Sequence, residues 1–99
     1  MRDDHGKIWE NYLISERLKK QEYEKMHRHN YFWRTHTKQE IDWIEEGGGK
    51  LHAYEFKWNP RKGNKTKVPI SWEKAYPTAT FEVIHPENYL AFITETNLK

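Results

Sequence analysis

The sequence predicts a small α/β domain in which a helix is followed by three strands, a second helix, a fourth strand and a short apolar end. A long segment of helix-forming residues without proline opens the chain. Aromatic and β-branched residues then cluster on both sides of a glycine-rich turn. Two prolines bound the short helical segment that precedes the fourth strand. The 99 residues suit a single domain, and the 15% of aromatic residues favour a compact aromatic core over disorder.

Residues 5–28 are expected to form the first helix, because straight-chain residues dominate and no proline interrupts them. The apolar residues of its first half fall within one arc of a helical wheel and predict the buried face: Ile8, Trp9, Tyr12 and Leu13. Beyond Leu18 the pattern becomes polar, so the second half of this helix is expected to face water.

The later elements are separated by glycine, proline and asparagine signals. We expect strands at 31–35, 41–44 and 51–58, a loop at 59–67, a helix at 69–76, a strand at 80–84 and an apolar segment of either type at 89–93. The glycines between the second and third strands predict an antiparallel hairpin.

This hairpin places acidic and basic side chains on one face. A turn at Gly48–Gly49 pairs residues whose numbers sum to 97, so Asp42 lies directly opposite Glu55. Lys57 lies two residues further along the third strand and therefore shares a face with Glu55. Two carboxylates and one ammonium group are thus expected close together.

Two opposed carboxylates repel each other, so the pair needs a shared proton, a cation or the Lys57 ammonium group. Mg²⁺ fits because it binds through one or two carboxylates and keeps several waters, and Mn²⁺ is the alternative ion. Such an ion would activate a water for attack on a phosphoryl group, with Lys57 orienting the water or stabilising the transition-state charge. The simpler alternative is a surface ladder of ion pairs in which Lys57 faces Glu40.

Several short segments, taken in order, resemble one family. They are Trp9–Leu13 with Glu16 and Leu18, Tyr31–Thr35, Glu40–Ile44, Tyr54–Lys57, Pro69, Ala75–Pro77 and Val83–Ile84. The chain is similar over nearly its whole length to the C-terminal, PD-(D/E)XK nuclease-like domain of unknown function in prokaryotic AAA+ superfamily ATPases. The resemblance implies a restriction-endonuclease-like αβββαβ core, with a mixed sheet flanked by helices.

In the nuclease family the first helix supplies a Glu, the second strand an Asp and the third strand a Glu-x-Lys sequence. The resemblance therefore implies four catalytic residues, of which the second and third hold the metal: Glu10, Asp42, Glu55 and Lys57. Glu16 is the alternative helix acid, because it lies on the apolar side of the wheel, where a carboxylate needs a partner. Ile41 stands where the motif has proline, which weakens the literal motif and leaves the metal chemistry untouched.

The resemblance also implies a partner domain. Residues 1–99 are expected to be a C-terminal piece of a longer protein with an N-terminal AAA+ ATPase domain. The glycine-rich Gly47–Lys50 segment is not a Walker A loop, since Leu51 replaces the Ser or Thr that would bind Mg²⁺. ATP binding and hydrolysis are therefore expected to be absent from these residues.

Basic residues after the third strand are candidates for contact with nucleic acid. They are Arg61, Lys62, Lys65 and Lys67, joined by Arg34 at the end of the first strand. Next to a metal site they would bind phosphates, and such binding weakens steeply with salt. The alternatives are a solvated loop and, for Arg34, a cross-strand ion pair.

The composition narrows the function further. The absence of cysteine excludes disulfides and thiolate zinc sites, and no apolar run is long enough to span a membrane. With no signal-peptide pattern at the start, the expected location is the cytoplasm. We first expect a Mg²⁺-dependent phosphodiesterase acting on DNA or RNA. The alternatives are a non-catalytic module that binds nucleic acid or protein and regulates the ATPase, and an interaction domain that forms a homodimer through its aromatic surface.

Overall fold

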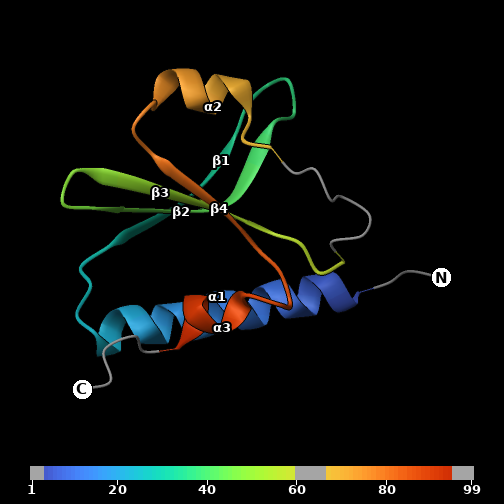
Figure 1. Cartoon of the computed structure of the whole chain (residues 1–99), viewed down its shortest axis with the longest axis vertical. Helices are drawn as coiled ribbons and strands as arrows, with labels where there is room; N and C mark the ends of the chain where they lie inside the picture. Colours follow the sequence, from blue (N-terminus) through green and yellow to red (C-terminus); the bar gives the residue numbers. More distant parts are fainter. Residues whose placement is uncertain (1–3, 60–66, 95–99) are drawn as a thin grey trace. The chain divides into compact units, whose positions relative to one another are not determined.

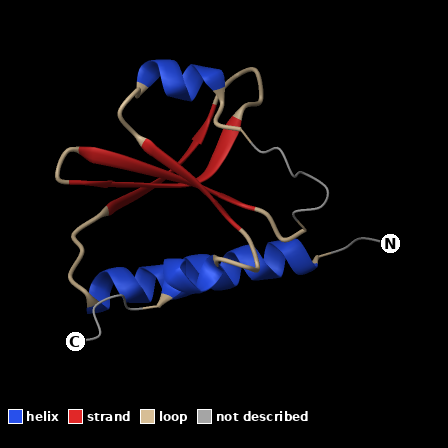
Figure 2. Ribbon diagram, viewed as in Figure 1, coloured by secondary structure: helices blue, strands red, loops and turns tan. Residues whose placement is uncertain are grey.

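The computed structural model describes residues 4–59 and 67–94 (Figure 1). Its helices and strands are α1 (His5–Tyr23), β1 (His29–Arg34), β2 (Glu40–Gly47), β3 (Lys50–Phe56), α2 (Ile70–Ala75), β4 (Thr80–Ile84) and α3 (Tyr89–Ile93). The predicted order of elements is confirmed, and the short apolar end is a helix (Figure 2). Within these two ranges, no helix combines the length and the hydropathy needed to cross a membrane.

The first helix ends at Tyr23, before the boundary expected from the sequence. The chain leaves the helix through Lys25, whose φ of 54° lies in the left-handed region. The Lys25 N–H donates to the Glu22 carbonyl at 3.2 Å, and the Met26 N–H donates to the Gln21 carbonyl at 2.8 Å. This pair of bonds is the Schellman arrangement, with a lysine at the position where glycine is usual.

The four strands form one sheet in the order β1-β2-β3-β4 (Figure 2). Both β1 with β2 and β2 with β3 are antiparallel. Contacts between β3 and β4 advance in the same direction along both strands, from the His52–Thr80 side-chain bond to the Lys57 N–H donated to the Ile84 carbonyl. β4 is therefore parallel to β3, and the sheet is mixed.

The register of β2 and β3 agrees with the register predicted from the glycine turn. The numbers of partner residues sum to 97 along the ladder, which runs from the turn to Trp43 opposite Tyr54. Gly48 and Gly49 have φ values of 61° and 80°. A two-residue type I′ hairpin turn requires positive φ at both central positions, so glycine fits here without strain.

A β-bulge interrupts the pairing of β1 with β2, and the sequence did not predict it. The partners on either side are Tyr31 opposite Ile44 and Trp33 opposite Ile41. Phe32 therefore faces two residues, Asp42 and Trp43. The extra residue brings Ile41 and Ile44 into the same core, although side chains three positions apart on a regular strand point to opposite faces.

The described residues form two compact units. The sheet unit contains residues 28–55 and 67–83, and the helical unit contains residues 4–27, 56–59 and 84–94. Each unit combines segments that are far apart in the sequence, so neither is a continuous part of the chain.

The core of the sheet unit is built from strand residues and α2. Its buried members are Ile41, Ile44, Ala53 and Trp72, and its partly buried members are Trp33, Leu51, Val68, Ala79 and Phe81. The Trp72 ring of α2 lies 5.4 Å from the Trp33 ring and 4.6 Å from the Tyr76 ring. The predicted aromatic character of the core is confirmed in this unit, where ring pairs at such distances add to the burial of apolar surface.

The helical unit places α1 and α3 side by side (Figure 1). Aromatic rings again make the packing: Phe56 and Phe92 meet edge to face at 5.6 Å, and Trp9 lies 5.3 Å from Trp58. The buried stripe of α1 runs through Trp9, Leu13, Arg17, Lys20 and Gln21.

This stripe corrects the predicted buried face of α1. Ile8 is 63% exposed and Tyr12 is 47% exposed, so half of the expected apolar arc faces solvent. The expectation that the second half of the helix faces water holds for Lys19, Glu22 and Tyr23 but was wrong for Lys20 and Gln21, which are buried. The buried face of α1 is therefore rotated about the helix axis, away from Ile8 and Tyr12 and towards Arg17 and Gln21.

Candidate metal and nucleic-acid site

The two predicted metal ligands lie in the sheet unit, on neighbouring strands. The β2–β3 ladder ends at Trp43 opposite Tyr54, and Asp42 and Glu55 are the residues that adjoin this last pair on each strand. Both carboxylate residues are half-buried. Asp42 is also a member of the β-bulge, and bulges commonly re-aim a side chain or end a pairing next to functional sites.

The other two predicted catalytic residues belong to the helical unit. Glu10 lies on α1 and is half-buried, next to the buried Trp9. Lys57 directly follows β3 and is half-buried, and its main-chain N–H donates to the Ile84 carbonyl at 2.8 Å. The four residues implied by the family motif are therefore divided equally between the two units.

Glu16, the alternative helix acid, makes a local ion pair. Its Oε2 lies 3.1 Å from the Lys19 Nζ one turn away, and 32% of the Glu16 side chain is exposed. Glu16 was favoured by its place within the expected apolar arc of α1. Because Ile8 and Tyr12 of that arc are exposed, this place no longer indicates a buried acid, and the family motif favours Glu10.

Arg34 makes the cross-strand ion pair that was one of its two expected roles. Its Nε lies 3.5 Å from Glu40 Oε1, and the Arg34 and Glu40 side chains are 61% and 54% exposed. The guanidinium carbon also lies 5.2 Å from the centre of the Phe32 ring. Ion pairs this exposed contribute little to stability and exchange readily with other partners, so a phosphate contact stays a prediction.

The basic loop that was expected to contact nucleic acid is mostly outside the described residues. Arg61, Lys62 and Lys65 lie there, and Lys67 is the first residue after the gap, where it is exposed.

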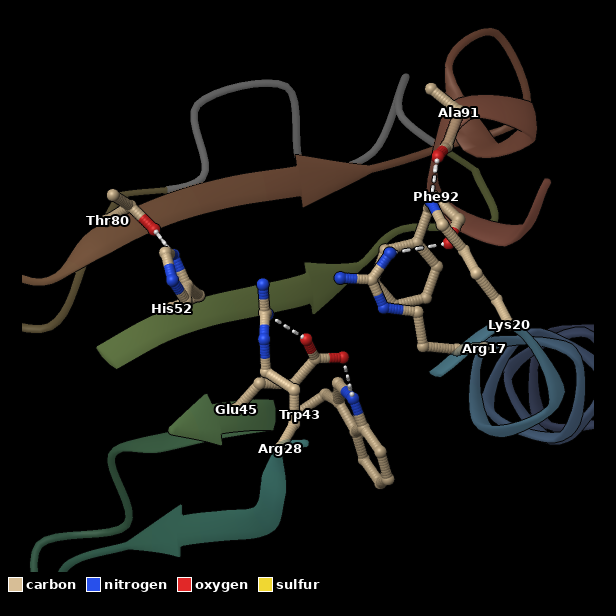
Figure 3. A network of polar contacts seen from close by, with 9 residues as sticks. All are labelled: Arg17, Lys20, Arg28, Trp43, Glu45, His52, Thr80, Ala91 and Phe92. Atoms are coloured by element: carbon tan, nitrogen blue, oxygen red, sulfur yellow. Dashed lines mark hydrogen bonds and ion pairs between the residues drawn. The ribbon is translucent and has the colours of Figure 1, made fainter. Parts of the chain in front are cut away.

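A buried acid that the sequence did not single out lies two residues after the bulge. Glu45 has no exposed surface, and its carboxylate accepts hydrogen bonds from Arg28 Nη1 at 2.5 Å and from Trp43 Nε1 at 2.9 Å (Figure 3). The Trp43 side chain and the Glu45 side chain share a face because they lie two apart on one strand. The two-residue spacing of Trp43 and Glu45 could have predicted this contact from the sequence. It was missed because the second strand was expected to end at Ile44, before Glu45.

Two buried cations that the sequence also missed hold the end of α3. Arg17 Nη1 donates to the Phe92 carbonyl at 2.7 Å, and Lys20 Nζ donates to the Ala91 carbonyl at 3.0 Å (Figure 3). The Arg17 guanidinium also lies 4.4 Å from the centre of the Phe92 ring. Basic side chains at a helix C-terminus satisfy its last carbonyls and complement its dipole.

A metal site in the described residues would depend on two protein ligands. No group of three or more His, Asp or Glu residues within 4–59 and 67–94 is arranged to hold a metal ion. Mg²⁺ is commonly held by one or two carboxylates, with water and substrate oxygens completing its coordination. The Asp42–Glu55 pair fits that donor set, whereas a Zn²⁺ site with three or four protein ligands does not fit.

The sheet unit also contains an open aromatic pocket of about 280 Å³. It is lined by Tyr31, Phe32 and Trp33 of β1, by Ile44 and Leu51, and by Trp72 and Tyr76. Three of its rings are largely exposed: Phe32 at 61%, Tyr31 at 52% and Tyr76 at 41%. The sequence predicted an aromatic core but not that part of the aromatic surface would stay open.

These features define a small α/β domain with a four-stranded mixed sheet and helices. The chain matches the model of a family described as a domain of unknown function (DUF4143) over residues 5–96, and it belongs to that family. No curated protein and no solved structure shows significant similarity to the chain.

Proposed function

We propose that this chain is a PD-(D/E)XK nuclease-like domain that acts on or binds nucleic acid, with a divalent metal ion held by Asp42 and Glu55. The observation that supports the proposal is the β2–β3 register, whose last pair, Trp43 opposite Tyr54, directly adjoins Asp42 and Glu55. The order of elements and the mixed sheet support the restriction-endonuclease-like core that the proposal requires.

Each of the proposed site residues has its own role in this function. Asp42 and Glu55 supply oxygen ligands, and Mg²⁺ bound there would polarise a phosphoryl oxygen and activate a water. Lys57 follows Glu55 by two residues, where its ammonium group would hold the attacking water or stabilise charge on the phosphate. Glu10 is the acid from the first helix, and Glu16 is its alternative.

Mn²⁺ binding tests the metal site without relying on catalysis. Electron paramagnetic resonance of Mn²⁺ added to the 99-residue chain should show bound ion, and Asp42→Asn or Glu55→Gln should weaken that binding at least about tenfold. Glu82→Gln, which changes an exposed acid on β4, is the matched control and should bind Mn²⁺ as the wild type does. Equal binding by all four proteins, or no binding by any of them, would refute the metal site.

The catalytic part of the proposal has a separate readout. With Mg²⁺ or Mn²⁺ the chain is expected to cleave DNA or RNA, and Asp42→Asn and Lys57→Ala are expected to abolish cleavage. Metal binding without cleavage of any nucleic acid would leave the metal site standing and remove the nuclease activity.

A non-catalytic module is the second candidate function, and the open aromatic pocket favours it. The pocket offers exposed rings for binding nucleic acid or protein without needing a metal. By the family resemblance the module would serve an N-terminal AAA+ ATPase domain, and a homodimer through the aromatic surface is a further form of it. Salt-sensitive binding of nucleic acid that persists in chelator and without cleavage would support this candidate.

A further inference from the structure

The aromatic pocket of the sheet unit lies against a basic segment of the chain. Residues 28–39 contain no Asp or Glu, and they carry Arg28, His29, Arg34, His36 and Lys38. Most of this segment is β1, whose Tyr31, Phe32 and Trp33 line the pocket. β1 is also the first strand in the sheet order, so one of its sides lies at the sheet edge.

The turn after β1 is held beside α2, which supplies two other pocket residues. Within the turn the Thr35 N–H donates to the Gln39 carbonyl at 2.9 Å, and the Lys38 N–H donates to the Thr35 carbonyl at 3.1 Å. The Ser71 hydroxyl of α2 donates to Gln39 Oε1 at 2.5 Å. This bond ties the turn that contains the exposed Lys38 to α2, the helix that supplies the pocket residue Trp72.

We propose that this pocket binds a base of single-stranded nucleic acid, and that Arg34 and Lys38 contact the phosphates on either side of that base. The inference rests on the proposed function, because it takes nucleic acid as the ligand of this domain. Stacking on an aromatic ring is open to every base, and a neighbouring positive charge attracts the backbone. The pocket combines both features, since its Phe32 and Tyr31 rings are exposed and the Arg34 guanidinium lies 5.2 Å from the centre of the Phe32 ring.

The positive charge of residues 28–39 favours nucleic acid over a second copy of the chain as the ligand of this pocket. Arg28 and Arg34 are paired with Glu45 and Glu40 of β2, but the Arg34 pair is exposed and Lys38 adds a further exposed positive charge. A second β1 added antiparallel at the sheet edge would bring these exposed cations of one copy against those of the other, and like charges across an interface are unfavourable. A polyanion meets the same segment with charges of opposite sign. A base within an intact duplex is already stacked, so the rings favour a single strand over a duplex.

The pocket is connected to the candidate metal site through the β-bulge. Phe32 of the pocket stands opposite Asp42 and Trp43, and neighbouring strands lie about 4.8 Å apart. A nucleotide stacked on Phe32 would therefore lie one strand away from Asp42.

Fluorescence anisotropy of a labelled oligothymidylate tests the proposal in a buffer that contains a chelator. Phe32→Ala should weaken binding about 5- to 100-fold, since loss of one stacked base has that effect. Phe32→Tyr keeps a ring and should restore binding to within about threefold of the wild type. Tyr23→Ala, which removes a 72% exposed ring on α1, is the matched control and should change the affinity less than twofold.

Two competitors separate the proposed ligand from other polyanions. A duplex of the same length and an acidic polyglutamate peptide should each displace the oligonucleotide at least about tenfold less well than an unlabelled single strand. Equal displacement by polyglutamate, equal binding by Phe32→Ala and wild type, or no binding at low salt would each overturn the proposal.

These outcomes are independent of the metal site. Because the oligonucleotide experiment is carried out in chelator, failure of Mn²⁺ binding with retained Phe32-dependent binding removes only the nuclease proposal. Retained Mn²⁺ binding with no effect of Phe32→Ala removes only the base pocket.

Discussion

The sheet unit and the helical unit both bury charged side chains, but these side chains contact different kinds of group. In the sheet unit the fully buried Glu45 carboxylate lies against the Arg28 guanidinium, a group of opposite charge. In the helical unit the buried Arg17 and Lys20 donate to main-chain carbonyls at the end of α3. Deleting Arg28 removes a group of opposite charge from a buried carboxylate, whereas deleting Arg17 or Lys20 removes donors to neutral carbonyls. The two units should therefore lose stability by different amounts when their cations are deleted.

Arg28→Ala is expected to have the largest effect. The substitution removes the guanidinium at 2.5 Å from Glu45 and leaves a carboxylate with no exposed surface. Breaking a buried pair in this way costs about 3–5 kcal/mol of unfolding free energy. Urea unfolding followed by tryptophan fluorescence would measure the loss.

Glu45→Gln tests the same ion pair by neutralising the carboxylate instead of deleting the cation. The Gln amide oxygen can still accept the Trp43 Nε1 hydrogen bond, and the Arg28 side chain is 20% exposed, so its charge retains access to water. A smaller loss of about 1–2 kcal/mol is expected. If Glu45→Gln destabilised the protein more than Arg28→Ala, the buried carboxylate would not be the group that depends most on the pair.

Arg17→Ala is expected to have the second largest effect. It removes the hydrogen bond to the Phe92 carbonyl and the stacking of the guanidinium on the Phe92 ring. Hydrogen bonds that involve a charged group contribute about 1.5–3 kcal/mol, and a loss of that size is expected in urea unfolding.

Lys19→Ala is the matched control for this change. The Lys19 side chain is 74% exposed on the same helix and pairs only locally with Glu16, so its loss should cost less than about 0.5 kcal/mol. A loss for Arg17→Ala as small as that of Lys19→Ala would show that the α3 carbonyls are satisfied equally well by water.

The same two units show which parts of the structure can be predicted from the sequence. The β2–β3 register follows from local information, because two adjacent glycines define the turn and the turn defines the partners of both strands. The same register extended by one residue predicts Asp42 opposite Glu55, but the observed pairing stops at Trp43 opposite Tyr54, where the bulge begins. The bulge at Asp42 and Trp43 does not follow from local information, since it arises where β2 packs both isoleucines against one core.

The buried charges were missed for the same reason. Arg17 and Phe92 are 75 positions apart in the chain, and no pattern within α1 shows that a carbonyl from α3 will lie over Arg17. A hydrophobic wheel assigns charged residues to the solvent, so the predicted face shared Trp9 and Leu13 with the true buried stripe but included Ile8 and Tyr12 and left out the polar members of the stripe, Arg17, Lys20 and Gln21. Pairings of this kind depend on tertiary contacts, and only the folded chain reveals them.

Two turns of the molecule differ in how they accommodate left-handed backbone, and this difference gives the smallest predicted effect. The β2–β3 turn has glycine at both positive-φ positions, whereas the turn at the end of α1 has Lys25 with a φ of 54°; Lys38 of the sheet unit is a second lysine with positive φ. A side chain in this conformation costs about 1–2 kcal/mol, and glycine recovers part of it at the expense of a more flexible unfolded chain. Lys25→Gly is therefore expected to stabilise the protein by about 0.5–1 kcal/mol.

The neighbouring residue provides the control for this last change. Glu24 has a φ of −92°, where glycine relieves no strain, so Glu24→Gly should destabilise the protein by a few tenths to about 1 kcal/mol. Thermal unfolding followed by circular dichroism would compare the two variants, and a shift of about 4–8 °C per kcal/mol is expected for a chain of this size. Opposite shifts in melting temperature would identify the lysine backbone as the strained position. A decrease for both variants would show instead that the Schellman turn at the end of α1 tolerates lysine without strain.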